Sequence, residues 1–293
     1  MAASLNGDFR GTFPFEPRFV SAGGVRLHYV DEGPADAAPL LFAHGNPTWS
    51  YLWRRPIAEL SSRGHRCVAF DHMGFGRSDK PPQLSAYSLH RHVDNALALI
   101  DALELSDVTL VAHDWGGPIG LGALLQRSDR LRGLILMNTW AWELPSFLPP
   151  FLREFRTEGL GEILALGGNL FVESIPGGMH RRDADPVMMD AYRAPFPDYW
   201  SRAATLAFQR EIPLTERDRS APLMASIHEQ LPNVSVPVRF VWGMRDPVFQ
   251  PVFLEQWREL FPNAVTVELA DASHFLVEDC PDAVTDAIEG FLR

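Results

Sequence analysis

Short apolar runs alternate with amphipathic segments through the first half of the chain. Residues 25–30 alternate apolar and polar side chains, which is the pattern of a strand with one solvated face. Four further runs are apolar at nearly every position, as strands buried on both faces of a parallel sheet are: residues 39–43, 67–70, 108–112 and 134–137. Residues 89–103 repeat apolar side chains at helical spacing. This alternation predicts an α/β protein with a mostly parallel, twisted sheet flanked by helices.

The strand pattern breaks after Trp140. Residues 143–221 are rich in Pro, Phe, Trp and charged side chains and contain no run typical of a central strand, which predicts a helical insertion. Two strands and a closing helix then follow, at residues 238–242, 264–269 and 282–292. We expect an α/β core made of residues 1–142 and 222–293, with residues 143–221 forming a helical cap. Residues 1–18 have no clear period and are expected to pack as an arm or to fray.

Composition narrows the class of protein. With 293 residues, 46% hydrophobic and 22% charged, the chain is long enough to bury a sizeable core. Its formal net charge of −11 disfavours nucleic acid and anionic membranes as partners, because phosphate binding needs a basic surface. The cysteines, Cys67 and Cys280, form no metal-ligand cluster, and Cys67 stands in an apolar run typical of a core thiol. The start of the chain lacks a secretory signal and no apolar run could cross a bilayer, so we expect a cytoplasmic protein.

The most informative stretch is residues 108–120. A strand ends at Ala112, a polar side chain stands near its tip, glycines follow at once and a helix begins. This is the context of the nucleophile elbow of the α/β-hydrolase fold, in which small neighbours let one side chain stand clear on a sharp turn. In place of the usual serine, this chain has Asp114.

A carboxylate at the elbow changes the chemistry. A serine alkoxide attacks carbonyl carbon, whereas a carboxylate attacks best at saturated carbon with a leaving group, or at a strained ring, and remains as an alkyl ester. Asp114 could instead cap the following helix, since Asp is a favoured N-cap residue. The flanking strand, the glycines and a downstream base favour the nucleophile.

A second loop, His44-Gly-Asn-Pro-Thr-Trp49, follows the strand at residues 39–43. We expect it beside the elbow, at the carboxyl ends of neighbouring strands, where open parallel sheets bind ligands. Its backbone would supply one amide of an oxyanion hole, and Trp115 the other. An ordinary strand-to-helix turn is the alternative interpretation.

Two late loops hold the candidate acid and base. Asp246 and His274 each follow a predicted strand, and the chain order of nucleophile, acid and base is the one this fold requires. Asp246 would hold His274 in the tautomer that leaves its other nitrogen free to take a proton from water. The rival position for the acid, after the strand at residues 134–137, holds the uncharged Asn138, and Glu143 lies further out.

Six segments carry a family resemblance: His44-Gly-Asn-Pro-Thr-Trp-Ser-Tyr-Leu-Trp-Arg54, Asp71-His-Met-Gly-Phe-Gly-Arg-Ser-Asp-Lys-Pro81, His113-Asp-Trp-Gly-Gly117, His274-Phe-Leu-Val-Glu-Asp279, Asn169-Leu-Phe-Val-Glu-Ser-Ile-Pro176 and Tyr192-Arg-Ala-Pro-Phe196. Together they resemble the haloalkane dehalogenases, and the last two resemble the cap domain of that family. His-Asp-Trp-Gly-Gly alone is shared with epoxide hydrolases. The longer motif that begins at Asn46 is much more particular to the dehalogenases.

The resemblance implies a mechanism. Asp114 would displace halide from saturated carbon by in-line attack, while the indole N–H of Trp115 and the side-chain amide of Asn46 stabilise the departing halide. His274, paired with Asp246, would activate water to hydrolyse the ester, releasing alcohol, halide and a proton. This combination resembles the branch with an Asp-His-Asp triad and an Asn-Trp halide pair. The implied partners are a small halogenated hydrocarbon, halide and water, with no metal or organic cofactor, in a monomer or a homo-oligomer.

Aromatic side chains are candidates for the substrate pocket. Phe171 matches a position that lines the pocket in relatives, with a core phenylalanine as the alternative, and Trp140 and Phe249 are further candidates. Trp142 and Trp200 could line the cleft too, although in a chain with eight tryptophans a position away from the cleft is the stronger alternative for each.

Two other functions stay open. An epoxide hydrolase uses the same triad and protonates the alkoxide with cap tyrosines, and Tyr192 and Tyr199 fall inside the insertion. Asn46 speaks against it, because its amide suits a halide and has no evident task in epoxide opening. A non-catalytic ligand-binding protein on a hydrolase fold would show a broken set of catalytic residues, whereas every expected member is present here.

Overall fold

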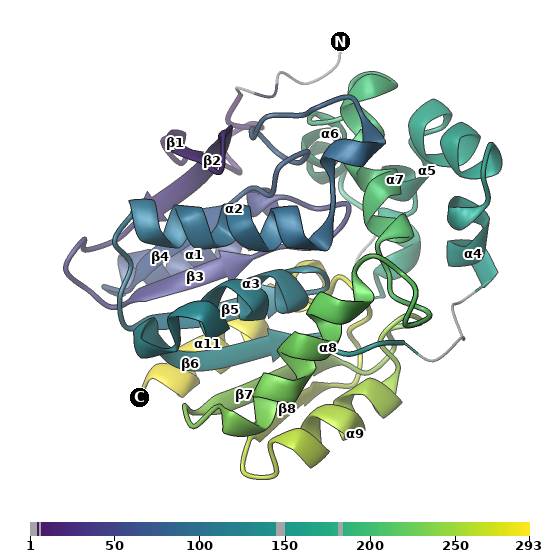
Figure 1. Cartoon of the computed structure of the whole chain (residues 1–293). Coiled ribbons are helices and arrows are strands. Elements are labelled where there is room, and N and C mark those ends of the chain that lie inside the picture. Colours follow the sequence, from purple (N-terminus) through teal and green to yellow (C-terminus); the bar gives the residue numbers. More distant parts are fainter. Residues whose placement is uncertain (1–4, 6, 145–149, 181–183) are drawn as a thin grey trace.

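The computed structural model describes residue 5 and residues 7–144, 150–180 and 184–293. Its core is one eight-stranded sheet with the strand order β1-β2-β4-β3-β5-β6-β7-β8 (Figure 1). The neighbours β1, β2 and β4 pair antiparallel, and the remaining neighbours from β4 to β8 pair parallel. From β1 to β8 the strands span Arg18–Ala22, Val25–Glu32, Pro39–Ala43, Arg66–Phe70, Val108–His113, Leu131–Met137, Val238–Gly243 and Val265–Leu269.

The sequence patterns predict every strand except β1. β1 lies at the edge of the sheet and is mostly exposed, so no buried alternation marks it. It joins β2 through Gly23 and Gly24, with φ of 59° and 80°, and Ala22 pairs with Val25. Two left-handed residues in a two-residue loop are what a tight hairpin with the natural strand twist requires.

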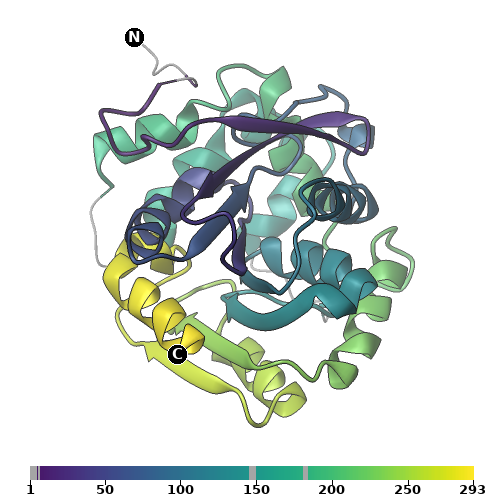
Figure 2. The ribbon, with the colours of Figure 1, turned by 90° about the vertical axis from the view of Figure 1, so that its left-hand side faces the viewer.

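Helices cover both faces of the sheet. α1 and α11 pack against each other on one face, while α3 packs against α2 and α8 on the other (Figures 1 and 2). The helix predicted at residues 89–103 is α2, and its first turn is capped by the Ser88 hydroxyl, which accepts from the amide of Arg91 at 3.1 Å. In chain order, α1, α2, α3, α8, α9, α10 and α11 span Arg54–Ser62, Leu89–Ala102, Gly116–Leu124, Ala221–Gln230, Pro251–Leu260, Leu276–Asp279 and Pro281–Leu292.

The described residues between β6 and α8 form short helices joined by loops and contain no strand, and they lie at one end of the sheet (Figure 1). Asp185 starts α6 by accepting from the amide of Val187 at 2.9 Å, with a proline in the first turn. Residues 145–149 and 181–183 of the predicted cap lie outside the described residues. The helices α4, α5, α6 and α7 span Pro150–Arg156, Leu170–Glu173, Pro186–Arg193 and Ala203–Arg210, and a π-helical turn spans Glu162–Gly167.

The described residues of the first segment pack as an arm. Phe9 and Phe13 are buried, and their rings contact those of Trp49 and Tyr51. Arg77 donates to two main-chain carbonyls of the arm, each at 2.9 Å. Residues 1–4 and 6 lie outside this described part. Among the described residues, no helix combines the length and the apolar character needed to cross a membrane.

Candidate active site

Asp114 stands on a sharp turn between β5 and α3. Its φ of 52° lies in the left-handed region, where a residue with a side chain is strained. The turn is held from one side by the neighbouring loop, because the amide of Asp114 donates to the carbonyl of Asn138 and its carbonyl accepts from the Thr139 hydroxyl at 2.5 Å. On the other side, a Cβ at Gly116 would lie 2.0 Å from the carbonyl oxygen of Ala43. The sequence signature of small residues after Asp114 therefore reflects a real close approach.

The Asp114 carboxylate is buried and is held by two main-chain amides. Its Oδ1 accepts from the amide of Asn46 at 2.8 Å, and the amide of Trp115 is a second donor to the carboxylate. Gly45 permits this approach, since a Cβ there would lie 2.1 Å from Oδ1. These are the two amides expected from the sequence for an oxyanion hole, and both donate to the carboxylate of the candidate nucleophile.

The imidazole of His274 meets a second buried carboxylate. Its Nδ1 lies 2.9 Å from Oδ2 of Asp246. The same Oδ2 accepts from the side-chain amide of Asn138 at 2.9 Å, and Oδ1 accepts from the amide of Val248 at 2.7 Å. Asn138 also exchanges hydrogen bonds with the backbone of Gly243. The residue after β6, which cannot itself be the acid, thus fixes the orientation of the acid after β7.

Burial and charge set the protonation of this group. Burial raises the pKa of Asp114 above its usual range, opposed by His274 and by the two main-chain amides. Burial lowers the pKa of His274, but the carboxylates of Asp246 and Asp114 outweigh it and the net pKa is raised. For Asp246, burial acts upward, but the nearby imidazole and main-chain amides hold its pKa below the usual value. The adjacent His113 is different: burial and the His274 charge lower its pKa to about 3, so it stays neutral near pH 7.

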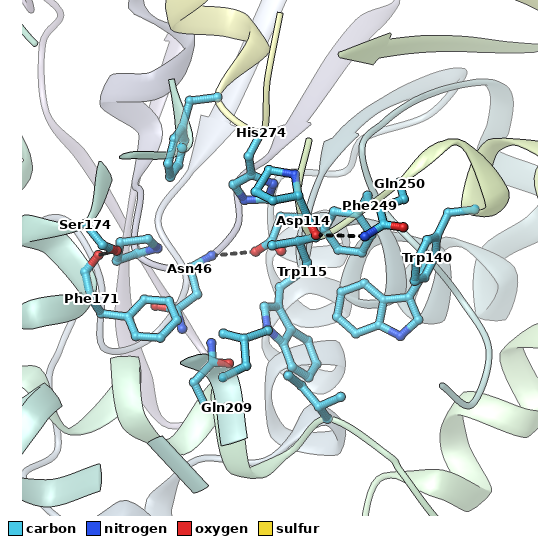
Figure 3. Close-up of a pocket in the computed structure, with 18 of the residues that line it drawn as sticks. Asn46, Asp114, Trp115, Trp140, Phe171, Ser174, Gln209, Phe249, Gln250 and His274 are labelled. Carbon is cyan, nitrogen blue, oxygen red and sulfur yellow. Dashed lines mark hydrogen bonds between the residues drawn. The ribbon is translucent and has the colours of Figure 1, made fainter. Parts of the chain in front are cut away.

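The backbone of His274 is also fixed. The ring of His113 donates through Nε2 to the His274 carbonyl at 2.8 Å, and the two imidazoles lie 4.9 Å apart. On the other side, the Phe249 ring stacks on the His274 ring at 5.7 Å. A base held in this way keeps one orientation relative to Asp114, which lies beside it in the close-up (Figure 3).

The side chains of Asn46 and Trp115 lie on the opposite side of Asp114 from His274 (Figure 3). Asn46 donates one N–H of its amide to the carbonyl of Thr205 in α7, at 3.0 Å. An amide NH2 group has two hydrogens, so one N–H of Asn46 remains for a ligand. The Trp115 ring is wedged between the rings of Trp140 and Phe208, at 4.8 Å and 5.0 Å.

These groups face a mostly apolar cavity of about 390 Å³, a size suited to a small organic molecule. Phe171, Trp140 and Phe249, the three candidate pocket residues, all line it. The described residues hold no group of His, Cys, Asp and Glu side chains arranged to bind a metal ion. The cavity is lined by Asn46, Pro47, Asp114, Trp115, Trp140, Leu144, Leu152, Phe171, Ser174, Gly177, Gly178, Gln209, Ile212, Pro247, Val248, Phe249, Gln250, Val252, Phe253, His274 and Phe275.

Four aromatic candidates from the sequence lie elsewhere. Trp142 is buried against Trp257, and Trp200 is 64% exposed. Tyr192 is fully buried and donates its hydroxyl to Glu278 at 2.5 Å, and Tyr199 is 41% exposed. The tyrosines that an epoxide hydrolase would need are therefore absent from the described lining of the cavity.

Two glutamines of the cavity, Gln209 and Gln250, escaped the sequence reasoning. Gln209 lies in α7, where every residue from Ala203 onward through Gln209 is buried. A glutamine among buried apolar residues, one helical turn after Thr205, is the signal that could have identified it. Its amide shares the cavity with Asn46 and Trp115 (Figure 3).

Comparisons with known proteins agree with this geometry. The family model of the alpha/beta hydrolase fold matches residues 38–167, which confirms the predicted fold. A curated relative from Shewanella oneidensis, "Cis-3-alkyl-4-alkyloxetan-2-one decarboxylase", is 38% identical over 286 residues, covering 95% of this chain and 89% of the relative. "Haloalkane dehalogenase 2" of Mycobacterium tuberculosis is 36% identical over 280 residues, covering 94% of each chain.

Solved structures extend the likeness to three dimensions. The crystal structure of haloalkane dehalogenase DbeA from Bradyrhizobium elkani superposes with a TM-score of 0.88 at 30% identity, covering 95% of this chain and 97% of that one. Identity at this level over nearly the full length of both chains includes the core and the cap segment alike. The chain is an enzyme of the α/β-hydrolase fold and belongs to the haloalkane dehalogenase family.

Proposed function

We propose that this enzyme hydrolyses a carbon–halogen bond at saturated carbon through a covalent ester on Asp114, with His274 and Asp246 as base and acid. The observation that carries the proposal is a buried carboxylate at the elbow, facing an apolar cavity, with the main-chain amide of Asn46 on Oδ1. A carboxylate in a dry, apolar site has lost most of its hydration, and fixed protein dipoles replace that water.

In the first step, Asp114 attacks the carbon that carries the halogen. Oδ1 is held by the amide of Asn46, so Oδ2 is the oxygen that forms the new bond. The carbon–halogen bond breaks, and its electron pair leaves with the halide. The indole N–H of Trp115 and the remaining N–H of Asn46 donate to that anion, where negative charge develops.

In the second step, water hydrolyses the ester. His274 takes a proton from water, and the hydroxide attacks the ester carbonyl carbon of Asp114. The negative charge of the tetrahedral intermediate falls on Oδ1, which already accepts from the amide of Asn46. The alcohol leaves, the carboxylate is restored, and His274 releases its proton with the help of the Asp246 charge. Substrate, water and halide are the partners that this cycle requires.

A second candidate reaction is the opening of an oxetan-2-one, and the relative from Shewanella oneidensis favours it. The ring carbon bonded to oxygen is saturated and carries a carboxylate leaving group in a strained ring, so Asp114 could attack it in the same way. The ring-opened carboxylate would then lose CO2, its electron pair would form a carbon–carbon double bond, and the Asp114 carboxylate would depart. This sequence consumes no water and needs no base.

The test is a halide-release panel of brominated, iodinated and chlorinated alkanes. We expect faster release from bromides and iodides than from chlorides, because the weaker bond lowers the barrier. Intact-protein mass spectrometry of His274→Ala after brief exposure to substrate should show an alkyl ester on Asp114. No halide from any compound, with alkene and CO2 formed from a cis-3,4-dialkyloxetan-2-one, would replace dehalogenation by the second reaction. Turnover of styrene oxide, with no reaction of the other compounds, would instead support epoxide hydrolysis.

A further inference from the structure

Gln209 places a buried amide in the active-site cavity. Its side chain is 4% exposed, and its Oε1 is buried with no hydrogen-bond partner. A leucine of similar volume would fill the same space without burying a polar group, and burying an amide without partners costs free energy. The orphaned atom is the acceptor oxygen, which an anion cannot satisfy. A ligand that accepts hydrogen bonds can meet this amide only through Nε2, the nitrogen that faces the cavity (Figure 3).

One face of α7 contacts both proposed halide donors, Asn46 and Trp115. The carbonyl of Thr205 accepts from the side-chain amide of Asn46, and the ring of Phe208 packs edge-on against Trp115. Gln209 follows Thr205 by one helical turn, so both lie on the same face of α7. This places Gln209 beside the position where the leaving group is expected.

The position of Gln209 is fixed at the end of α7. Arg156 from α4 donates through Nη1 to the carbonyl of Gln209 at 2.6 Å and to that of Ile212 at 2.9 Å. The side chain thus extends from an anchored backbone, and its amide nitrogen points toward Asn46 and Asp114 in the close-up (Figure 3). A donor held in this way is preorganised for an anion.

We propose that Gln209 is a third N–H donor at the leaving-group position and that it adapts the site to a leaving carboxylate, released when an ester of a saturated alcohol is cleaved at its alkyl carbon. The inference rests on the proposed attack by Asp114. A halide is a single spherical anion, and the N–H groups of Asn46 and Trp115 can both donate to it. A carboxylate has two oxygens and about four lone-pair sites, so a third donor satisfies an oxygen that the other two leave open.

The chemical step balances without another reactant. A bond forms between Oδ2 of Asp114 and the saturated carbon, while the carbon–oxygen bond of the substrate ester breaks. Its electron pair stays on the departing carboxylate, and no proton or electron is exchanged. Asp114 becomes neutral as the leaving group becomes charged, so Gln209 meets the charge where it develops.

Anion binding tests the inference without turnover. The Asp114→Asn variant serves as background, because its neutral amide resembles the neutral ester present when the leaving group departs. Bromide is titrated by its quenching of tryptophan fluorescence, and hexanoate by its competition with bromide. We expect Gln209→Leu in this background to weaken hexanoate binding about 10-fold or more, as the loss of a hydrogen bond to a charged group does. Bromide affinity should change less than about two-fold, because its two donors remain.

Gln126→Leu is the control, because Gln126 is not part of the described cavity lining and donates its amide to the carbonyl of Gly122 at 2.8 Å. It should leave both affinities unchanged. Equal losses for hexanoate and bromide in Gln209→Leu would make Gln209 a structural residue, and unchanged hexanoate affinity would remove it from the leaving-group position. Either result overturns the inference. Because no reaction is needed, these titrations decide on Gln209 even where the haloalkane panel refutes dehalogenation.

Discussion

Replacing Asp246 by asparagine separates the two proposed steps. Both oxygens of Asp246 accept hydrogen bonds: Oδ2 from His274 and from Asn138, each at 2.9 Å, and Oδ1 from the amide of Val248 at 2.7 Å. In Asp246→Asn, the new NH2 group must face one of these donors in either orientation. Facing His274, it forces Nδ1 to accept a hydrogen bond and moves the ring proton to the other nitrogen, which can then no longer take a proton from water.

The size of the effect follows from this tautomer change. The equivalent substitution in a serine protease triad lowers kcat about 10⁴-fold, which is about 5.5 kcal/mol at about 1.4 kcal/mol per tenfold change. Ester hydrolysis should fall by this order in Asp246→Asn. Ester formation should change less than about 10-fold, because Asp114 attacks carbon without giving up or taking a proton.

Rapid-mixing measurement of halide release distinguishes the steps. With excess bromoalkane, Asp246→Asn should release about one halide per active site in a fast burst and then turn over very slowly. Mass spectrometry at the end of the burst should show the ester. Asp271→Asn is the control, because Asp271 is an exposed partner of Arg245 on the same loop as His274, and it should behave as the wild type. A steady-state kcat within about 10-fold of wild type, or loss of the burst itself, would refute the proposed roles.

Three further outcomes follow from the same contacts. Gly45→Ala would place a Cβ 2.1 Å from Oδ1 of Asp114, so halide release should fall about 10²-fold or more while circular dichroism stays that of the wild type. Tyr192→Phe removes a hydroxyl that donates to the buried Glu278, and we expect the free energy of unfolding in urea to fall by about 1.5–3 kcal/mol. The raised pKa of His274 means that kcat should fall as pH drops through this pKa, because the protonated ring cannot accept a proton from water. In the ester intermediate Asp114 carries no charge, so it no longer raises the pKa of His274. The apparent pKa from the acidic side of the kcat–pH profile should therefore lie below the pKa of His274 that NMR gives for the free enzyme.

Each of these has a result that would contradict it. Full activity of Gly45→Ala would mean that the loop and the carboxylate are not in close contact. Tyr199→Phe, at an exposed position, is the control for Tyr192→Phe, and equal stabilities of the two variants would remove the buried contact with Glu278. A kcat that does not change between pH 5 and 9 would exclude His274 as the base in the slow step.

Most strands, the elbow and the helical segments could be predicted from the sequence, because each depends on a pattern of neighbouring residues. The identity of the side chain at the elbow, the glycines around it and the strand before it are consecutive in the chain, and each has a local physical cause. The helical insertion is equally visible, because a long segment without strand patterning cannot join the sheet. β1 escaped because an exposed edge strand needs no apolar alternation.

The finer arrangement of the site depends on packing between segments far apart in the chain. The sequence determined that a carboxylate replaces serine at the elbow and which loops follow it. Only the tertiary structure decided that Asn138 orients Asp246, that Tyr192 turns to Glu278 rather than to the cavity, and that Gln209 lines the same cavity as Asn46. Periodicity reports which face of a helix is buried, because it depends on neighbours three or four residues away. What that face is buried against depends on residues far away in the chain, 86 positions for Tyr192 and Glu278 and 108 for Asn138 and Asp246, and no local pattern contains this information.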